Sequence, residues 1–249
     1  MVKARYGRQE RGHAVRDSAA KAEHGQKETV MGDAEKQALR DGMVREGGYW
    51  ARYHEVLLGR DPAFLKAYIA FQAAPARSGF LEKKLCEFIY IAIDMSVNHM
   101  YERGGRRHME HALRAGASPE ELMQVVTLTP VVSAHHPIDA GLDILGEELH
   151  ADTGTALLET VPELARGYKA YDDAVWESGP LSRKDKELIA LAVCAAPTCL
   201  FEPGMRRHIR GALKAGATAP EIAAVLHLSG ALAIHTCTIG VPAFDDVMN

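Results

Sequence analysis

The sequence predicts an all-α protein built from two tandem helical repeats. Identical residues recur at a constant offset of 100 positions, and about a third of the pairs between 62–137 and 162–237 match without a gap. Apolar residues follow the spacing of a helix face in both halves, whereas no stretch shows the period-two alternation of a strand. Self-similarity of this length indicates duplication of one supersecondary unit, so we expect an internal pseudo-dimer.

Helical spacing is clearest in the longest apolar run of each half. Residues 81–93 place apolar side chains on one helix face, and residues 181–193 repeat the pattern. Ser182, with Asp185 three residues later, predicts a capping box at the start of the second of these helices.

Two further helices are predicted after each apolar run. The first is expected over about 106–115, because Gly116 offers the left-handed residue that ends a helix. Residues 118–121, Ser-Pro-Glu-Glu, then supply an N-cap, a first-turn proline and an N3 carboxylate for a helix over 122–134. The second repeat carries similar signals 100 residues later.

Composition and charge exclude several classes of protein. The 249 residues are 47% hydrophobic and 25% charged, which is typical of a globular protein with a full core. A net charge of -4 argues against a basic surface that would bind nucleic acid or an anionic membrane. The apolar stretches 88–95 and 226–244 are too short or too interrupted to predict a membrane-spanning helix. Residues 1–30 lack the apolar run expected of a secretory signal. The four cysteines lie in no CxxC spacing, so we expect a reduced, cytoplasmic protein.

The chain divides into three expected regions. Residues 1–45 form a polar arm with few large apolar residues. Residues 46–149 and 150–249 form the first and second repeats. One repeat alone would expose an apolar face, so we expect the two to pack together and the protein to form a homo-oligomer.

A family resemblance rests on the segment that follows the apolar helix. The second repeat has the run His208-Ile-Arg-Gly-Ala-Leu-Lys-Ala-Gly-Ala-Thr-Ala-Pro-Glu-Ile and then Gly240-Val-Pro-Ala243, and the first repeat has a similar run from His108. These runs resemble the carboxymuconolactone decarboxylase family, which includes the alkylhydroperoxidase-D-like proteins, over roughly residues 50–245. The resemblance implies two tandem helical domains of that family.

The sequence departs from the peroxidase-type branch of this family, which carries Glu, eleven residues, Cys-x-x-Cys and a nearby His. Here Glu87 is followed by His99-Met-Tyr-Glu102, and Glu187 by Cys199-Leu-Phe-Glu202. No dithiol can form within either motif, so thiol-based peroxide reduction is not expected. Each histidine also lies two positions later than in that branch, which predicts a loop around Gly104-Gly105 before the helix.

Glutamate and histidine without thiols suit the lactone decarboxylase branch, and the resemblance implies its cofactor-independent chemistry. Loss of carbon dioxide leaves a delocalised carbanion that needs a proton at carbon, and an imidazole with an ordinary pKa near 6.5 suits that transfer. The expected substrate is a small lactone or related unsaturated carboxylic acid of aromatic-compound degradation.

The candidate site residues are polar groups that recur in both repeats, together with one position where the repeats differ. His108 and His208 are expected to be the acid–base groups. The other assignments are Glu102 and Glu202 to orient the imidazoles, Glu87 and Glu187 as relays or ion-pair partners, His135 and His235 to close the pocket, Arg107 and Arg207 to bind the substrate anion, and His99 and Cys199 to contact substrate.

Two alternatives remain open. Glu102, His108 and His135 are ligand types for a divalent metal, and two histidines with one carboxylate leave coordination positions for substrate. A duplicated helical unit also suits a non-catalytic assembly module. In the simplest interpretation, each recurring histidine is a buried side chain bonded to a backbone carbonyl, and the paired arginines are a solvated helix start.

Overall fold

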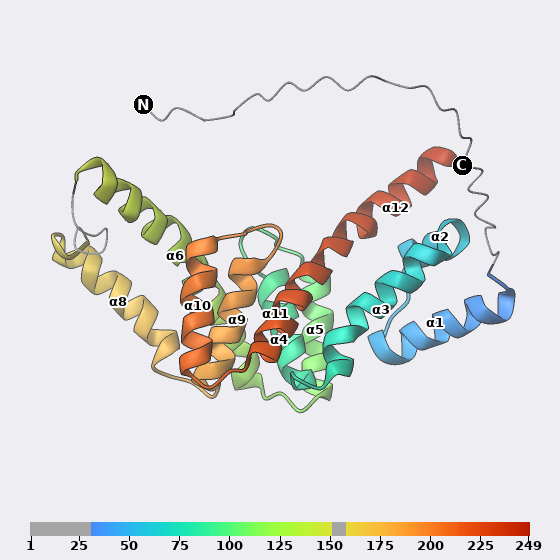
Figure 1. The fold of residues 1–249 in the computed structure, drawn as a ribbon, viewed down its shortest axis with the longest axis horizontal. Helices are drawn as coiled ribbons and strands as arrows, with labels where there is room; N and C mark the ends of the chain where they lie inside the picture. The colour runs from blue at the N-terminus through green and yellow to red at the C-terminus, as the bar shows by residue number, and fades with distance from the viewer. Residues whose placement is uncertain (1–30, 151–157) are drawn as a thin grey trace, which may run out of the picture.

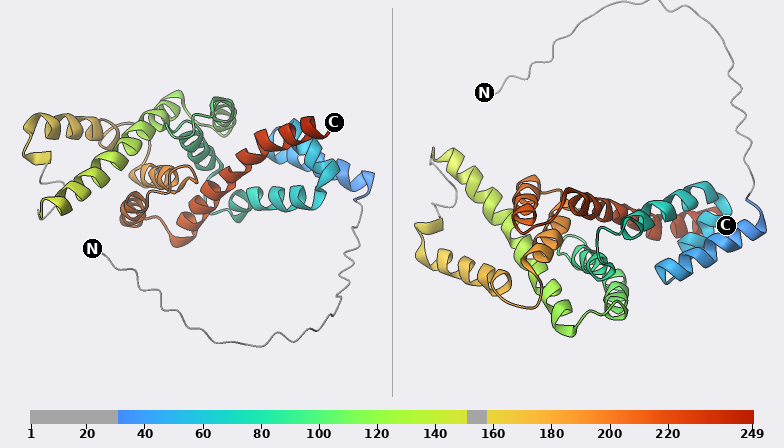
Figure 2. Two further views of the ribbon diagram at one scale, coloured as in Figure 1. Left: turned by 90° about the horizontal axis from the view of Figure 1, so that it is seen from above. Right: turned by 60° about the horizontal axis from the view of Figure 1, so that its bottom comes forward.

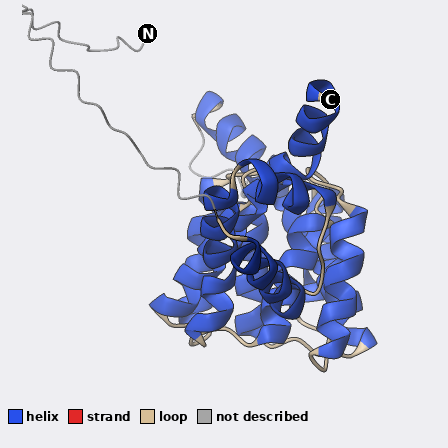
Figure 3. Ribbon diagram, turned by 90° about the vertical axis from the view of Figure 1, so that its right-hand side faces the viewer, coloured by secondary structure: helices blue, strands red, loops and turns tan. Residues whose placement is uncertain are grey.

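The regular structure of the chain is helical wherever the structure describes it. A computed structural model describes residues 31–150 and 158–249, and Figure 3 shows only helices and loops there. The prediction of an all-α protein is confirmed.

Each repeat contributes a similar series of helices (Figure 1). The first half contains α1 (Asp33–Gly47), α2 (Arg52–Arg60), α3 (Pro62–Ser78), α4 (Lys83–Asp94), α5 (Glu102–Arg114) and α6 (Pro119–Glu148). The second half contains α8 (Pro162–Trp176), α9 (Arg183–Ala195), α10 (Glu202–Lys214), α11 (Ala219–Ala231), the 3₁₀ turn η1 (Leu232–Ile234) and α12 (His235–Met248).

The apolar helices α4 and α9 form the centre of the molecule. They pack against each other, and α6 and α11 each contact both of them. Their apolar side chains, such as Ile89 on α4 and Ile189 on α9, are fully buried in one shared core. The two repeats therefore form a single internal pseudo-dimer rather than two independent cores.

The outer helices are exchanged between the repeats. Helix α3 of the first repeat packs on α11 of the second, and α8 of the second packs on α6 of the first. Figure 2 shows the resulting arms, with α6 and α8 at one end and α12 beside α1 to α3 at the other. Each repeat consequently supplies one wall of the space beside the other repeat's central helices.

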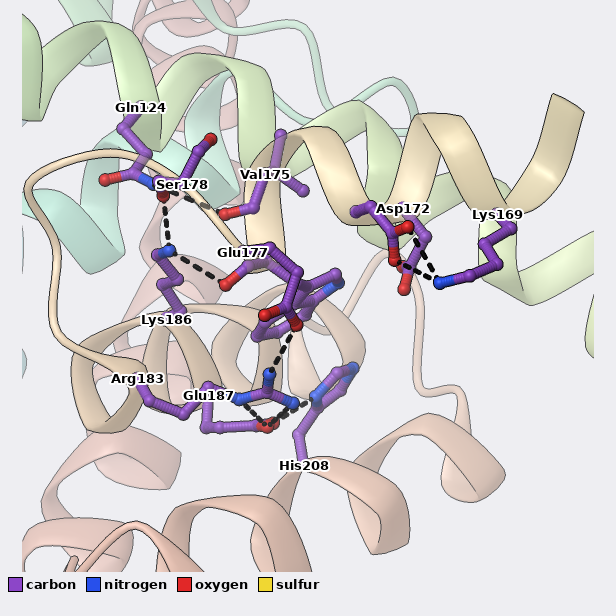
Figure 4. Close-up of polar contacts among 12 residues, drawn as sticks. Gln124, Lys169, Asp172, Val175, Glu177, Ser178, Arg183, Lys186, Glu187 and His208 are labelled. Atoms are coloured by element: carbon purple, nitrogen blue, oxygen red, sulfur yellow. Dashed lines mark hydrogen bonds and ion pairs between the residues drawn. The ribbon is translucent and has the colours of Figure 1, made fainter. Parts of the chain in front are cut away.

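A buried amide strengthens the link between the repeats. The Gln124 side chain of α6 donates to the carbonyls of Val175 and Ser178 (Figure 4). Its oxygen accepts from the backbone N–H of Leu181. These bonds tie α6 to the end of α8 and to the turn before α9.

The predicted helix caps are present. The Ser118 hydroxyl accepts from the Glu121 N–H at 3.1 Å, and the Glu121 carboxylate accepts from the Ser118 N–H at 2.8 Å. At Ser182 the hydroxyl caps α9 by accepting from the Asp185 N–H, but the Asp185 carboxylate accepts from that hydroxyl instead of from the backbone. Gly116 has φ +90°, as a left-handed stop requires.

The predicted loop at Gly104-Gly105 is wrong, because both glycines lie inside α5, which already begins at Glu102. They are needed for close packing rather than for a turn. A Cβ on Gly104 would overlap the Asp94 carboxylate, and one on Gly204 would lie 2.6 Å from the Cys194 sulfur. Helices α5 and α10 can therefore approach α4 and α9 closely enough to bring their histidines to the central carboxylates.

Part of the predicted N-terminal arm is helical. Residues 33–47 form α1, and Met31 before this helix and Met43 within it are buried. Apolar residues are too sparse there to predict the packing. Residues 1–30 of the predicted arm lie outside the described residues.

One helical run among the described residues, Ala219–Met248, is long and apolar enough to cross a membrane by length and composition. The first half of this run is α11, which packs against α3, α4 and α9 in the core. Core packing therefore explains the apolar character of α11. Helix α12, in contrast, exposes Ile239, Phe244 and Val247.

Truncation of the shared core should destabilise the whole chain. Leu191 on α9 is fully buried, so Leu191→Ala should lower the free energy of unfolding by about 2–5 kcal/mol through lost contacts and a residual cavity. Leu164→Ala removes the same atoms from a side chain that is 59% exposed and should change it by less than about 0.5 kcal/mol. Urea unfolding followed by circular dichroism measures both, and equal losses would contradict the shared core.

Candidate functional site

Each repeat places a glutamate of its central helix against a histidine of the next helix. His108 Nδ1 on α5 lies 2.7 Å from Glu87 Oε2 on α4, and His208 Nδ1 on α10 lies 2.8 Å from Glu187 Oε2 on α9. These four side chains are at most 13% exposed. We call the two pairs the first dyad and the second dyad.

The expected orienting role of Glu102 and Glu202 is contradicted. Their side chains are 75% and 69% exposed, and each pairs with the arginine one turn later on its own helix, Arg106 or Arg206. They lie in the first turn of α5 and α10, where a carboxylate is favoured by the unpaired N–H groups of the helix start. The orienting carboxylates are Glu87 and Glu187.

The first dyad holds an ionised carboxylate and a neutral imidazole. Burial alone would raise the pKa of Glu87, but contacts from His108 and His111 outweigh burial and hold this pKa at about 2. Burial lowers the pKa of His108 below its ordinary value, against the opposing effect of Glu87. Neutral His108 then donates its Nδ1 proton to Glu87, which leaves Nε2 free to accept or, once protonated, to deliver a proton.

The second dyad has a different supporting group. Arg183 donates from Nε to Glu187 Oε1 at 2.8 Å (Figure 4). Arg183 also lies over the Trp176 ring, which stacks on His208. Gly211 occupies the position of His111, and a Cβ there would overlap the Glu187 carboxylate. Burial would raise the pKa of Glu187, but the bonds from His208 and Arg183 lower it.

A cavity of about 370 Å³ opens beside the second dyad. Its walls come from both repeats, because α6 supplies His135 and Asp139 while α8 supplies Tyr168, Asp172 and Trp176. His135 therefore lies at the pocket wall as expected, although it serves the dyad of the other repeat. His135 Nε2 is 2.8 Å from Asp172 Oδ1.

Arg207 also lines this cavity, but its guanidinium is already paired. It forms an ion pair with Asp139, and its NH1 lies 3.4 Å from His135 Nδ1. A substrate anion would have to share this arginine with Asp139. Arg183, which is half exposed in the same wall, is the second cation available there.

A larger cavity of about 510 Å³ lies beside the first dyad. Glu87, His108 and His111 face it, and α1 contributes Arg45 to its wall. Arg107 is not among its lining residues. Its guanidinium lies 3.8 Å from the Tyr49 ring centroid and lines a separate cavity. The contribution of α1 was missed because that segment carries no repeat signal.

Behind the first dyad lies Asp94, a residue that the sequence did not mark as part of the site. Asp94 at the end of α4 is fully buried, and neither of its side-chain oxygens has a hydrogen-bond partner. His99 Nε2 and His235 Nδ1 lie 3.8 and 3.9 Å from its Oδ1 and only 2.8 Å from each other, and His108 Nε2 lies 4.0 Å from its Oδ2. Burial raises the pKa of Asp94 to about 7.

The second repeat replaces this group with thiols. Cys194 and Cys199 occupy the positions of Asp94 and His99, and His136 of the first repeat lies 3.4 and 3.3 Å from their sulfurs. Burial raises the pKa of both thiols, to about 12 for Cys194. Protonated thiols are poor nucleophiles, which agrees with the expected absence of thiol peroxidase chemistry.

The metal set suggested by the sequence, Glu102, His108 and His135, is not brought together. Glu102 faces solvent beside Arg106, and His135 belongs to the cavity of the second dyad. Among the described residues, two other groups gather ligand atoms within 4.8 Å: Glu87 with His108 and His111, and Asp94 with His99 and His235.

The chain is thus a tandem all-α protein with a buried Glu–His pair in each repeat. The model of the carboxymuconolactone decarboxylase family matches residues 62–134 and 162–245, more than half of the chain. The chain belongs to this family.

One solved structure similar to this chain comes from Burkholderia xenovorans LB400 and is provisionally identified as a gamma-carboxymuconolactone decarboxylase subunit. It is 31% identical, with a TM-score of 0.78, and the match covers 86% of this chain and 97% of that one. A search of the curated proteins found no match.

The buried and exposed glutamates should differ in their effect on stability. At pH 7, Glu187→Gln removes the charge that holds His208 and Arg183 and should lower the free energy of unfolding by about 1–3 kcal/mol. Glu202→Gln, the exposed control, should lower it by less than about 0.5 kcal/mol.

Acid should reduce this difference. The pKa of Glu187 is lowered in the folded protein, so its contribution is fully present above the unfolded pKa, declines below it, and is lost as pH falls through the folded pKa. Urea unfolding at pH 7 and at pH 4 measures the effect. A loss from Glu187→Gln as small as that from Glu202→Gln at pH 7 would contradict the assignment of the orienting carboxylates.

Proposed function

We propose that this protein is a decarboxylase-like enzyme that acts on a small lactone or related unsaturated carboxylic acid by His–Glu acid–base catalysis. The observation that carries the proposal is the recurrence of a buried Glu–His pair in both repeats, each beside a cavity with an arginine in its wall. Cavities of this size suit a small organic acid.

The proposed reaction transfers one proton to carbon. The carbon–carboxylate bond breaks, carbon dioxide leaves, and the electron pair spreads into the conjugated carbonyl as a dienolate. Protonated imidazole then gives its Nε2 proton to the carbanion carbon, and the proton is replaced from solvent. Ionised Glu187 or Glu87 stabilises the imidazolium through the bond to Nδ1, so the step itself requires no cofactor.

Recognition of the substrate carboxylate falls to the cations in each wall. Arg183 in the second cavity and Arg45 in the first are the candidates. We retain Arg207 as a further candidate in competition with Asp139.

We also propose a cytoplasmic homo-oligomer with no nucleic-acid or membrane partner. The structural neighbour is described as a subunit, and large apolar side chains are exposed on the two protruding arms: Ile144 on α6 and Leu149 directly after it, and Ile239, Phe244 and Val247 on α12. Association through these arms would cover the apolar faces of both.

Substitution of the two histidines tests the proposed catalysis. With separate sites, His108→Ala and His208→Ala should each leave the activity of the other site, whereas the double variant should lose about 10²–10⁴-fold in kcat. Carbon dioxide release from gamma-carboxymuconolactone and a panel of related unsaturated acids is the measurement.

Two outcomes would exclude the proposal. One is a double variant that retains the full rate, and the other is a folded protein that releases no carbon dioxide from any member of the panel. His227→Ala is the matched control, because His227 bonds to the Phe71 carbonyl away from both dyads and should leave the rate unchanged.

The pH dependence tests whether the histidine acts in its protonated form. In the His108→Ala background only the second site acts, so kcat/KM should fall as pH rises through the pKa of His208, which burial lowers. Because Glu187 raises that pKa, Glu187→Gln should move the fall to lower pH. If kcat/KM falls at the same pH with and without Glu187→Gln, Glu187 does not act through His208.

A further inference from the structure

We propose that the first repeat binds one divalent transition-metal ion between Asp94, His99 and His235, a site that the second repeat lacks. The three ligand atoms come from the end of α4, the loop after it and the start of α12. The site therefore joins the two repeats. It is independent of the proposed proton transfer, which the second dyad can perform without it.

The distances among the ligand atoms fit a metal ion with little rearrangement. An ion about 2.1 Å from each of three ligands holds those atoms roughly 3.0–3.4 Å apart. Here His99 Nε2 and His235 Nδ1 are 2.8 Å apart, and they lie 3.8 and 3.9 Å from Asp94 Oδ1. Movements of a few tenths of an ångström would complete the coordination geometry.

The burial of Asp94 supplies an independent reason for a cation. Its side chain is completely inaccessible, and both oxygens lack a hydrogen-bond partner although three histidines surround them. A buried carboxylate is costly unless it is protonated, paired or bound to a metal. Gly104 leaves space that this carboxylate occupies, since a Cβ there would overlap Oδ2.

His108 borders the site on the side of the first dyad. Its Nε2 lies 4.0 Å from Asp94 Oδ2, while its Nδ1 is held by Glu87.

An open side gives the ion access to small molecules. His235 lines a cavity of about 380 Å³ together with Tyr101 and Arg107. Two imidazoles and one carboxylate favour zinc, ferrous iron or cobalt over magnesium or calcium, and three protein ligands leave positions for water or a substrate. Arg107 in the wall suits an anionic molecule bound to the ion.

The second repeat does not conserve this ligand set. Cys194 and Cys199 replace the aspartate and the first histidine, and the nearby His136 contacts both sulfurs. Among the described residues, these three are not one of the groups whose ligand atoms all lie within 4.8 Å of one another. We therefore expect no ion at the equivalent position of the second repeat.

Cobalt is the probe for this site, because a bound Co²⁺ gives visible absorption bands. Untagged full-length protein is treated with a chelator, dialysed, titrated with Co²⁺ and then dialysed again. We expect one retained equivalent by elemental analysis, a saturable visible band, a raised Tm, and displacement of Co²⁺ by Zn²⁺.

Variants locate the ion. His235→Ala and Asp94→Asn should each lower retained cobalt at least tenfold, the range expected on loss of one ligand or more. Asp94→Asn is nearly isosteric, so a folded variant is expected, and its circular dichroism and Tm in chelator are compared with those of the parent protein. The matched controls His136→Ala and His227→Ala should retain one equivalent.

Several results would overturn the proposal. They are a folded parent protein that retains no cobalt and shows no saturable band, retention unchanged in both His235→Ala and Asp94→Asn, or loss of cobalt in His136→Ala instead. None of these affects the proposed proton transfer, because His208→Ala and Glu187→Gln test that transfer at the second dyad, where the metal ligands are absent.

Discussion

The packing of α4 against α9 determines most of what this molecule can do. Both helices are apolar on nearly every side, yet each carries one glutamate in its second turn, Glu87 or Glu187. A carboxylate buried there must be paired, and the close approach of α5 and α10 provides a histidine for each. The glycines that permit this approach, Gly104 and Gly204, are therefore as necessary to the dyads as the histidines themselves.

The two dyads share this geometry but differ in what surrounds them. Glu87 is supported by a second histidine, His111, whereas Glu187 is supported by Arg183 and has a glycine at the equivalent position. Both arrangements keep the carboxylate ionised, so the imidazole is held in the same orientation by different means. Duplication has preserved the central pair while the cavity walls have diverged.

Recurrence in the sequence predicted the fold and part of the site. The helical periodicity, the caps at Ser118 and Thr218 and the repeated histidines all describe local or duplicated features, which one sequence can reveal. Recurrence alone does not distinguish Glu102 from Glu87, because both recur in the second repeat. Burial is what separates an exposed ion pair from a carboxylate that orients a histidine. Burial depends on which helices meet, and that information is not local.

Asp94 could not be found in this way, because its counterpart is Cys194 and it recurs nowhere. Its neighbours are equally distant in sequence, since His235 reaches it from the other repeat. The covering helix α1 was missed for a related reason: it lies before the duplicated segment and has few apolar residues. Features that distinguish the repeats from each other were thus the hardest to predict.

The exchange of α3 and α8 between the repeats has an evolutionary consequence. Tyr168 of the second repeat and His135 of the first repeat line the same cavity. A change in one repeat therefore alters the surroundings of residues in the other. Fusion into one polypeptide keeps both halves under joint selection, and it allows each pocket to acquire features that two identical chains would be obliged to share.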